Sequence, residues 1–176
     1  MSTTDRVSDT RSATRNVLVA VGVDAAVVVL DQLSKTWAVR ALADDHTIDL
    51  VGSLRFNLAF NTGASFSMGA GLGPVFAAIV VVVVVLLLRY ARHVTSAVGL
   101  VAVGMVVGGA IGNVLDRIFR AGVGDDRGLL GGAVVDFIDL QWWPIFNVAD
   151  IGVVVGAVLL VVTSWIHADD DDHVEG

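Results

Sequence analysis

The sequence contains no cysteine, one lysine, one glutamate and only two prolines. Without cysteine, the chain has no thiol nucleophile, no disulfide, no thiolate metal ligand and no lipidated cysteine of its own. The four histidines are scattered and the one glutamate is Glu175, so the His-Glu-x-x-His pattern of a metalloprotease is absent. We therefore expect neither a metal nor a cofactor.

Charged residues are also scarce, at 16% of the chain, whereas 55% of the residues are hydrophobic and the mean hydropathy is +0.77. Among chains of 176 residues, one this apolar is typical of an integral membrane protein with a single domain. The net charge of −7 owes much to an acidic tail at residues 167–176, which we interpret as a solvated terminal run. We infer no binding partner from that charge, and we expect no nucleic acid to bind.

Four apolar runs are long enough to cross a bilayer, which takes about 20 helical residues. We expect transmembrane helices at about residues 16–42, 74–92, 94–115 and 148–166. Residues 1–15 are polar and lack periodicity, which predicts a disordered lead before a first helix that is retained. Small residues four apart, which let helices approach closely in lipid, recur in the third and fourth runs. They are Gly104, Gly108, Gly112, Gly152 and Gly156.

Residues 46–67 differ from these runs because their apolar side chains alternate with polar ones and are interrupted by turn residues such as Gly52 and Gly63. That pattern predicts strands. A small sheet with open edges cannot lie in hydrocarbon, so we expect it outside the bilayer, packed on the helix ends. The expected fold class is an all-α polytopic membrane protein with four transmembrane helices and a small extracytoplasmic β cradle. Arg89 and Arg92, between the second and third runs, favour a cytoplasmic location for that connection and for both ends of the chain.

Two acids, Asp136 and Asp150, flank an aromatic turn just before the fourth run. An ionisable group at a membrane boundary is a functional-site candidate by default. Asp136 follows two valines, which disfavours ionisation, whereas Asp150 lies at the start of a helix, whose dipole favours it. Carboxylates in contrasting surroundings can supply both an acid and a base, as in an aspartic hydrolase. A helix-capping Asp150 and a structural Asp136 would give the same pattern.

A third group of charges lies in the first run, where Asp24, Asp31 and Lys35 are spaced seven and four residues apart. This spacing places them on one helical face and lets Asp31 meet Lys35 across one turn. Two interpretations stay open, a buried ion pair that fixes helix packing and a pair that supports a site.

Five polar motifs occur in a characteristic order. They are Asp31-Gln-Leu-Ser-Lys35, Asn61-Thr-Gly-Ala-Ser-Phe-Ser67, Gly108-Gly-Ala-Ile-Gly-Asn-Val-Leu-Asp-Arg117, Val134-Val-Asp-Phe137 and Phe146-Asn-Val-Ala-Asp150. Together, over residues 16–166, the chain resembles the lipoprotein signal peptidases (signal peptidase II). The resemblance implies a four-helix peptidase domain in the bacterial cytoplasmic membrane, with its active site on the outer face. It implies cleavage of diacylglyceryl-modified prolipoproteins just before the lipidated cysteine. We expect contact with membrane lipid and a monomer.

The resemblance also assigns roles by motif position. It implies that Asp136 and Asp150 are the catalytic dyad. The further polar positions of the pattern are Asp31, Lys35, Asn61, Asn113, Arg117 and Asn147. We expect Asp116 to pair with a neighbouring arginine, with the alternative that it is the true partner of Asp150. Residues 120–132 form a longer connection than the short form of the family has, which concerns how substrate is covered.

Rival interpretations differ in the chemistry that they assign. Gly122-Val-Gly-Asp125 matches a Gly-x-Gly-Asp protease motif, but it lies in a charged stretch and lacks a Tyr-Asp partner. A serine and lysine dyad would need Ser34 beside Lys35, and neighbours on a helix point in different directions. The runner-up is a small proton-coupled carrier that uses the same acids, although no internal repeat is present. A purely structural membrane subunit is third, and it leaves the ordered polar motifs unexplained.

Overall fold

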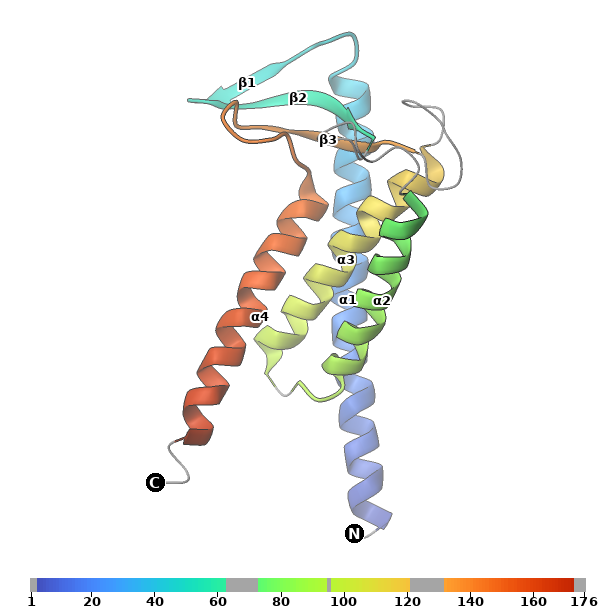
Figure 1. Cartoon of the computed structure of the whole chain (residues 1–176), viewed down its shortest axis with the longest axis vertical. Coiled ribbons are helices and arrows are strands. Elements are labelled where there is room, and N and C mark those ends of the chain that lie inside the picture. Colours follow the sequence, from blue (N-terminus) through green and yellow to red (C-terminus); the bar gives the residue numbers. More distant parts are fainter. Residues whose placement is uncertain (1–2, 63–72, 95, 121–131, 173–176) are drawn as a thin grey trace.

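The computed structural model describes residues 3–62, 73–94, 96–120 and 132–172, and the statements below concern these residues. Four helices stand side by side, and a small sheet lies across one end of them (Figure 1). In chain order the elements are α1 (Thr3–Ala41), β1 (Ile48–Val51), β2 (Leu54–Asn61), α2 (Gly73–Ala91), α3 (Ala97–Phe119), β3 (Val134–Asp139) and α4 (Val148–Asp172). The start of α1 and the end of α4 both lie away from the sheet.

Three helical segments in the described ranges are long and apolar enough to cross a membrane, namely Thr14–Ala41, Ala97–Phe119 and Val148–Ile166. A shorter apolar helical segment, Ala78–Ala91, lies within α2. Several boundaries differ from those expected. The helix α1 starts at Thr3 where we expected a disordered lead to residue 15, and α4 continues to Asp172, into the expected acidic tail. Hydropathy marks where a helix is apolar, whereas backbone hydrogen bonds continue through polar residues and set where it ends.

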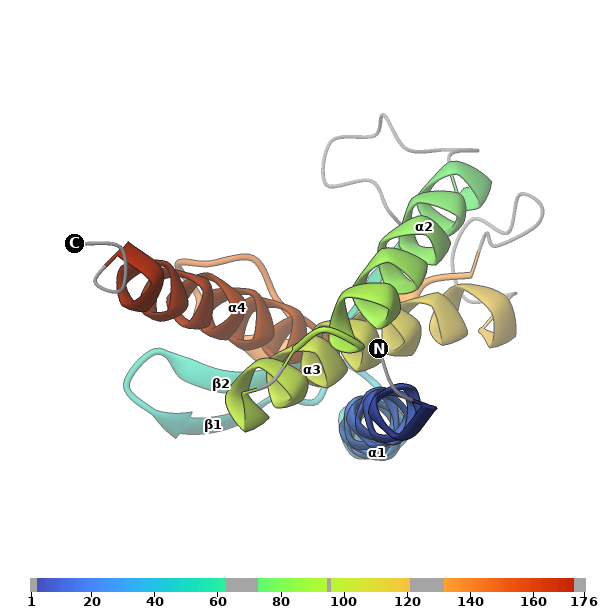
Figure 2. The same ribbon diagram turned by 90° about the horizontal axis from the view of Figure 1, so that it is seen from below.

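The helix α3 is the centre of the bundle. It packs most extensively against α4 and α1, and the view from below shows α2 and α4 diverging from it (Figure 2). The predicted glycines explain these close contacts. A Cβ on Gly104 would lie 2.5 Å from the Ala20 carbonyl oxygen of α1, and one on Gly108 would lie 2.7 Å from that of Asp24. Gly109, which the four-residue spacing did not include, faces the Ala149 carbonyl of α4 in the same way.

The sheet is antiparallel, in the order β1-β2-β3. The first two strands lie within residues 46–67, where strands were expected, and they form a hairpin that turns at Gly52, whose φ of 59° suits glycine. The third strand, β3, was not predicted. Its residues Val134 to Phe137 are all buried, so the alternation that identifies a half-exposed strand is missing there.

An aromatic cluster joins the sheet to α1. The Trp37 ring meets the Phe56 ring edge to face, with centroids 5.2 Å apart, and lies 6.2 Å from the Phe137 ring. Ala38 of α1 and Leu42, which follows its last residue, are buried together with Phe137, and Phe56 packs against them. Because Phe137 follows Asp136 in β3, this contact holds Asp136 over the helix ends.

Candidate active site

Asp136 and Asp150 reach the same region from different elements, β3 and the first turn of α4. Asn147 connects them. Its Nδ2 donates to Asp136 Oδ1 at 2.6 Å, and its Oδ1 accepts from the Asp150 backbone N–H at 3.0 Å. In return, Asp150 Oδ2 accepts from the Asn147 backbone N–H at 3.1 Å. This reciprocal pattern is a capping box, in which a residue just before the helix and one in its first turn satisfy each other's backbone donors.

Asp136 is buried, with 3% of its surface exposed. It lies among the apolar residues of β3, and Asn61 Nδ2 of the neighbouring strand donates to its Oδ2 at 3.1 Å. Burial raises the pKa of Asp136 from 3.8 to about 6, while the hydrogen bonds from Asn61 and Asn147 oppose the rise and the negative charge of Asp150 adds to it. The sequence predicted this direction from the flanking valines.

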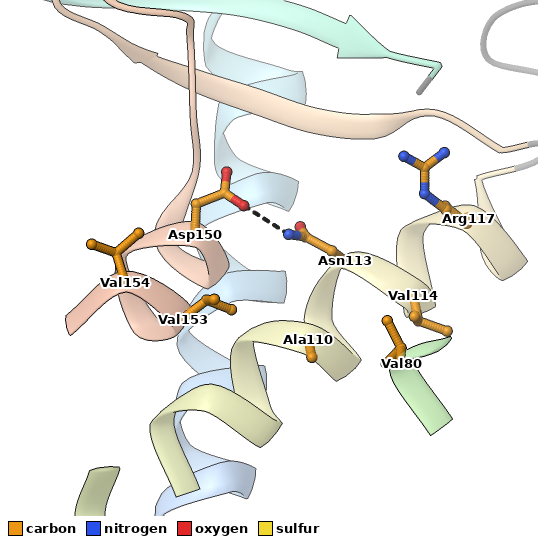
Figure 3. A pocket seen from close by; sticks show the side chains of 8 residues that line it. All are labelled: Val80, Ala110, Asn113, Val114, Arg117, Asp150, Val153 and Val154. Atoms are coloured by element: carbon orange, nitrogen blue, oxygen red, sulfur yellow. Dashed lines mark hydrogen bonds between the residues drawn. The ribbon is translucent and has the colours of Figure 1, made fainter. Parts of the chain in front are cut away.

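Asn113 of α3 contacts Asp150 from the other side and extends the hydrogen-bond network to Lys35. Its Nδ2 donates to Asp150 Oδ1 at 2.9 Å (Figure 3). Its Oδ1 accepts from Lys35 Nζ at 2.9 Å and from Asn147 Nδ2 at 3.1 Å. Both carboxylates therefore accept from side-chain amides, and the two asparagines also contact each other.

A layer of buried charge lies next to Asn113. Lys35 Nζ is 2.8 Å from Asp31 Oδ2 and 2.9 Å from Asp116 Oδ2, and all three side chains are fully buried. Asp116 Oδ1 also pairs with Arg120 Nε at 2.8 Å. The expected pairing of Asp116 with an arginine is thus seen, and the arginine is Arg120, four residues along the chain at the C-cap of α3.

Two cavities meet at Asp150. The first, of about 370 Å³, is walled by three helices and contains the Asn113–Asp150 contact, with the Arg117 guanidinium at one side (Figure 3). It is lined by Val80, Ala110, Asn113, Val114, Arg117, Asp150, Val153 and Val154. The second, of about 430 Å³, lies between α4 and the link that precedes it, and it is lined by Leu140, Trp142, Trp143, Phe146, Asp150, Ile151, Val154 and Val155. Space for a substrate therefore exists on both sides of Asp150.

The structure thus brings most of the predicted polar positions together. Asp136, Asp150, Asn61, Asn113 and Asn147 form one hydrogen-bonded group. Of the four remaining positions, Asp31, Lys35 and Asp116 form the charged layer beside it, and Arg117 lines the first cavity. Within the described ranges, no three histidine, aspartate or glutamate side chains are grouped as a metal site would need.

Sequence reasoning missed Gln32. Its Nε2 lies 3.1 Å from each of three acceptors, namely Asp31 Oδ2, the Gly112 carbonyl and Asp116 Oδ1. Its place inside the first motif was the only available signal. The rival Ser34 donates to the Asp31 carbonyl at 2.8 Å and no Ser34–Lys35 hydrogen bond is present, while Asp125 lies outside the described residues.

Comparisons with known proteins agree with the geometry. The family model described as Signal peptidase (SPase) II matches residues 23–166. Two proteins described as lipoprotein signal peptidases, from Mycobacterium leprae (strain Br4923) and Mycobacterium avium (strain 104), are 39% and 41% identical to this chain over 158 residues. These matches cover 89% of this chain and 76% and 84% of the two relatives.

The fold has a counterpart among solved structures. A structure described as a bacterial membrane enzyme has a TM-score of 0.72 with this chain at 23% identity, and the match covers 86% of this chain and 90% of the other. That likeness concerns the fold alone. Because the family model and the relatives span most of the chain, including all five polar motifs, this multi-pass membrane protein belongs to the signal peptidase II family of proteases.

Proposed function

We propose that the protein is an aspartic endopeptidase that removes signal peptides from diacylglyceryl-modified prolipoproteins by cleaving just before the lipidated cysteine. One observation supports the aspartic mechanism most directly. Two carboxylates in contrasting surroundings, Asp136 buried in the sheet and Asp150 at a helix start, are joined through Asn147 beside a cavity. Family membership supports the protease and its substrate class, and it argues against a carrier.

In this mechanism Asp150 is the base. It takes a proton from a water molecule whose oxygen attacks the scissile carbonyl carbon, and protonated Asp136 gives its proton to the carbonyl oxygen. When the resulting diol collapses, one hydroxyl returns a proton to Asp136, the C–N bond breaks, and the leaving nitrogen takes the proton held by Asp150. A pKa of about 6 suits Asp136 to this role, because a neutral carboxyl remains accessible near neutral pH.

The proposed membrane arrangement has four spans. The helix α2 has 19 residues, which at 1.5 Å each give about 28 Å, close to the roughly 30 Å thickness of a hydrocarbon core. With the connection of Arg89 and Arg92 in the cytoplasm, the sheet and the dyad lie at the outer face of the cytoplasmic membrane. We also propose that the monomer is the working unit.

The two cavities support the substrate class. A lipidated prolipoprotein carries an apolar signal segment on one side of the scissile bond and acyl chains on the other. Asp150 lies between two cavities whose walls are mainly apolar, so apolar groups can extend from the reacting bond in two directions. Arg117 and Asn113 provide polar groups in the first cavity for the main chain of the substrate.

The test is cleavage of a purified precursor by detergent-purified protein. A lipidated prolipoprotein should lose its signal peptide at the bond before the modified cysteine, as read by mass spectrometry of both products. The same precursor without its lipid serves as the substrate control, and Asp150→Asn serves as the enzyme control. Equal cleavage of both precursors would refute the substrate class, and turnover by Asp150→Asn would refute the mechanism.

A further inference from the structure

Lys35 lies far in the sequence from both proposed catalytic acids, yet its fully buried ammonium touches the group that contains them. Nζ has three partners, namely Asp31 Oδ2 at 2.8 Å, Asp116 Oδ2 at 2.9 Å and Asn113 Oδ1 at 2.9 Å. An ammonium has three donors and no acceptor, so all of its donors are used. Whatever atom faces Lys35 must be an acceptor.

This requirement sets the orientation of the Asn113 amide. An asparagine amide presents an oxygen on one side and an NH₂ group on the other. With Oδ1 held against Lys35, Nδ2 points toward Asp150 and donates to it at 2.9 Å. If the amide were turned over, its NH₂ group would face the Lys35 ammonium, donor against donor, and its oxygen would face the Asp150 carboxylate. Lys35, together with Asn147 Nδ2, which donates to the same oxygen at 3.1 Å, therefore determines which end of Asn113 meets Asp150.

A second route runs through the backbone. Asp31 uses Oδ2 for Lys35 and Oδ1 for the backbone N–H of Ala149, which donates at 2.9 Å. Ala149 lies in the first turn of α4, where backbone N–H groups have no partner within the helix. Asp150 is the next residue. Lys35 thus holds the start of α4 in place as well as the amide that contacts the Asp150 side chain.

We infer that Lys35 is a positioning residue for Asp150, acting through the Asn113 amide and through Asp31 at the start of α4. This inference rests on the proposed function, because it assigns Lys35 a part in holding the proposed base. The competing explanation is that Lys35 only neutralises buried carboxylates. Arg120 already pairs with Asp116, so the layer holds two cations and two carboxylates, and a neutralising role would not require the contact with Asn113.

The test compares Lys35→Met, Asn113→Ala and the double variant for cleavage of the lipidated precursor. A misplaced catalytic group can cost about 100-fold in rate, so we expect each single change to lower kcat by about 10- to 100-fold. KM should change little in Lys35→Met, whereas Asn113→Ala should also raise KM because Asn113 lines the first cavity. Because both residues act on Asp150 along one path, the double variant should lose much less than the product of the two single losses. Losses that multiply would contradict the path through Asn113.

A control separates positioning from stability. Asn16, also on α1, donates from Nδ2 to the Val94 carbonyl at 2.7 Å in a buried contact remote from the site. Asn16→Ala should lower the melting temperature and leave kcat unchanged. Deuterium exchange at the Ala149 and Asp150 amides should rise in Lys35→Met and stay at the wild-type level in Asn16→Ala. Unchanged exchange at these two amides in Lys35→Met would overturn the backbone route.

A charge-balanced variant keeps the inference testable if Lys35→Met does not fold. Lys35→Met with Asp31→Asn removes one buried charge of each sign and leaves the Arg120–Asp116 pair. This variant should be recovered folded and remain slow. Wild-type kcat in it, or in folded Lys35→Met, would overturn the inference while leaving the proposed function intact. Failure of wild-type protein to cleave the precursor would instead refute the proposed function.

Discussion

The burial of Asp136 makes a testable prediction about stability. Its pKa rises from 3.8 to about 6 on folding, so between these pH values the folded protein binds more protons than the unfolded chain. The contribution of Asp136 to the free energy of unfolding should therefore be greatest below pH 3.8, fall as pH rises to about 6, and stay level above it. This rise in the pKa of Asp136 corresponds to about 3 kcal/mol of lost stability at neutral pH.

Asp136→Asn removes this penalty and keeps the shape of the side chain. The NH₂ group of the introduced asparagine would face one of the two amide donors from Asn61 and Asn147, so one hydrogen bond is lost, at a cost of about 1–2 kcal/mol. At about pH 7.5 the variant should then be more stable than the wild type by about 1–2 kcal/mol, or about 2–8 °C in melting temperature. At about pH 4 the advantage should vanish or reverse, because Asp136 is already largely neutral there.

The measurement is thermal unfolding in detergent across this pH range, and Asp139 in the same strand provides the matched control. Burial alone would raise the pKa of Asp139, but hydrogen bonds from Arg55, the Gln141 backbone and Asn57 outweigh it and lower that pKa below 3.8. Its contribution to stability is present above pH 3.8 and is lost as pH falls through the lowered value. Asp139→Asn should therefore destabilise the protein at neutral pH. An identical pH dependence for wild type and Asp136→Asn would refute the reasoning.

Three further predictions concern activity and packing. Asp136→Asn and Asp150→Asn should each abolish detectable cleavage of a lipidated precursor. The double change should lower kcat little more than either change alone, because the effects of residues that act as a unit are not additive. Substantial turnover by either folded variant would remove that residue from the mechanism. Gly112→Ala would place a Cβ 2.6 Å from Asp31 Oδ2, so it should lower the free energy of unfolding by about 1–3 kcal/mol and slow cleavage. Gly22→Ala, whose Cβ would have nothing within 4 Å, should do neither. Equal melting temperatures for the Gly112→Ala and Gly22→Ala variants would contradict this packing. Asp125→Asn, which tests the Gly-x-Gly-Asp motif, should leave cleavage largely intact, and complete loss in a folded protein would restore that rival.

Local features of the fold could be predicted from the sequence because local chemistry determines them. Apolar runs predicted four spanning helices, of which three are long and apolar enough to cross a membrane within the described ranges. Alternation predicted strands where β1 and β2 lie. The Asp31–Lys35 ion pair follows from a spacing of one helical turn, and Asp150 at a helix start predicts a capping role. Each of these depends on residues a few positions apart.

The remaining contacts depend on chain segments that only tertiary packing brings together. Asn61 and Asp136 are 75 residues apart, and their hydrogen bond exists because β2 pairs with β3, a strand without alternation. Lys35 and Asn113 are 78 residues apart and meet because glycines let α1 and α3 approach closely. Motif order indicated that these residues belong to one site. Which atom donates to which acid was decided by packing, because a buried amide or ammonium must take the partners that its neighbours leave available.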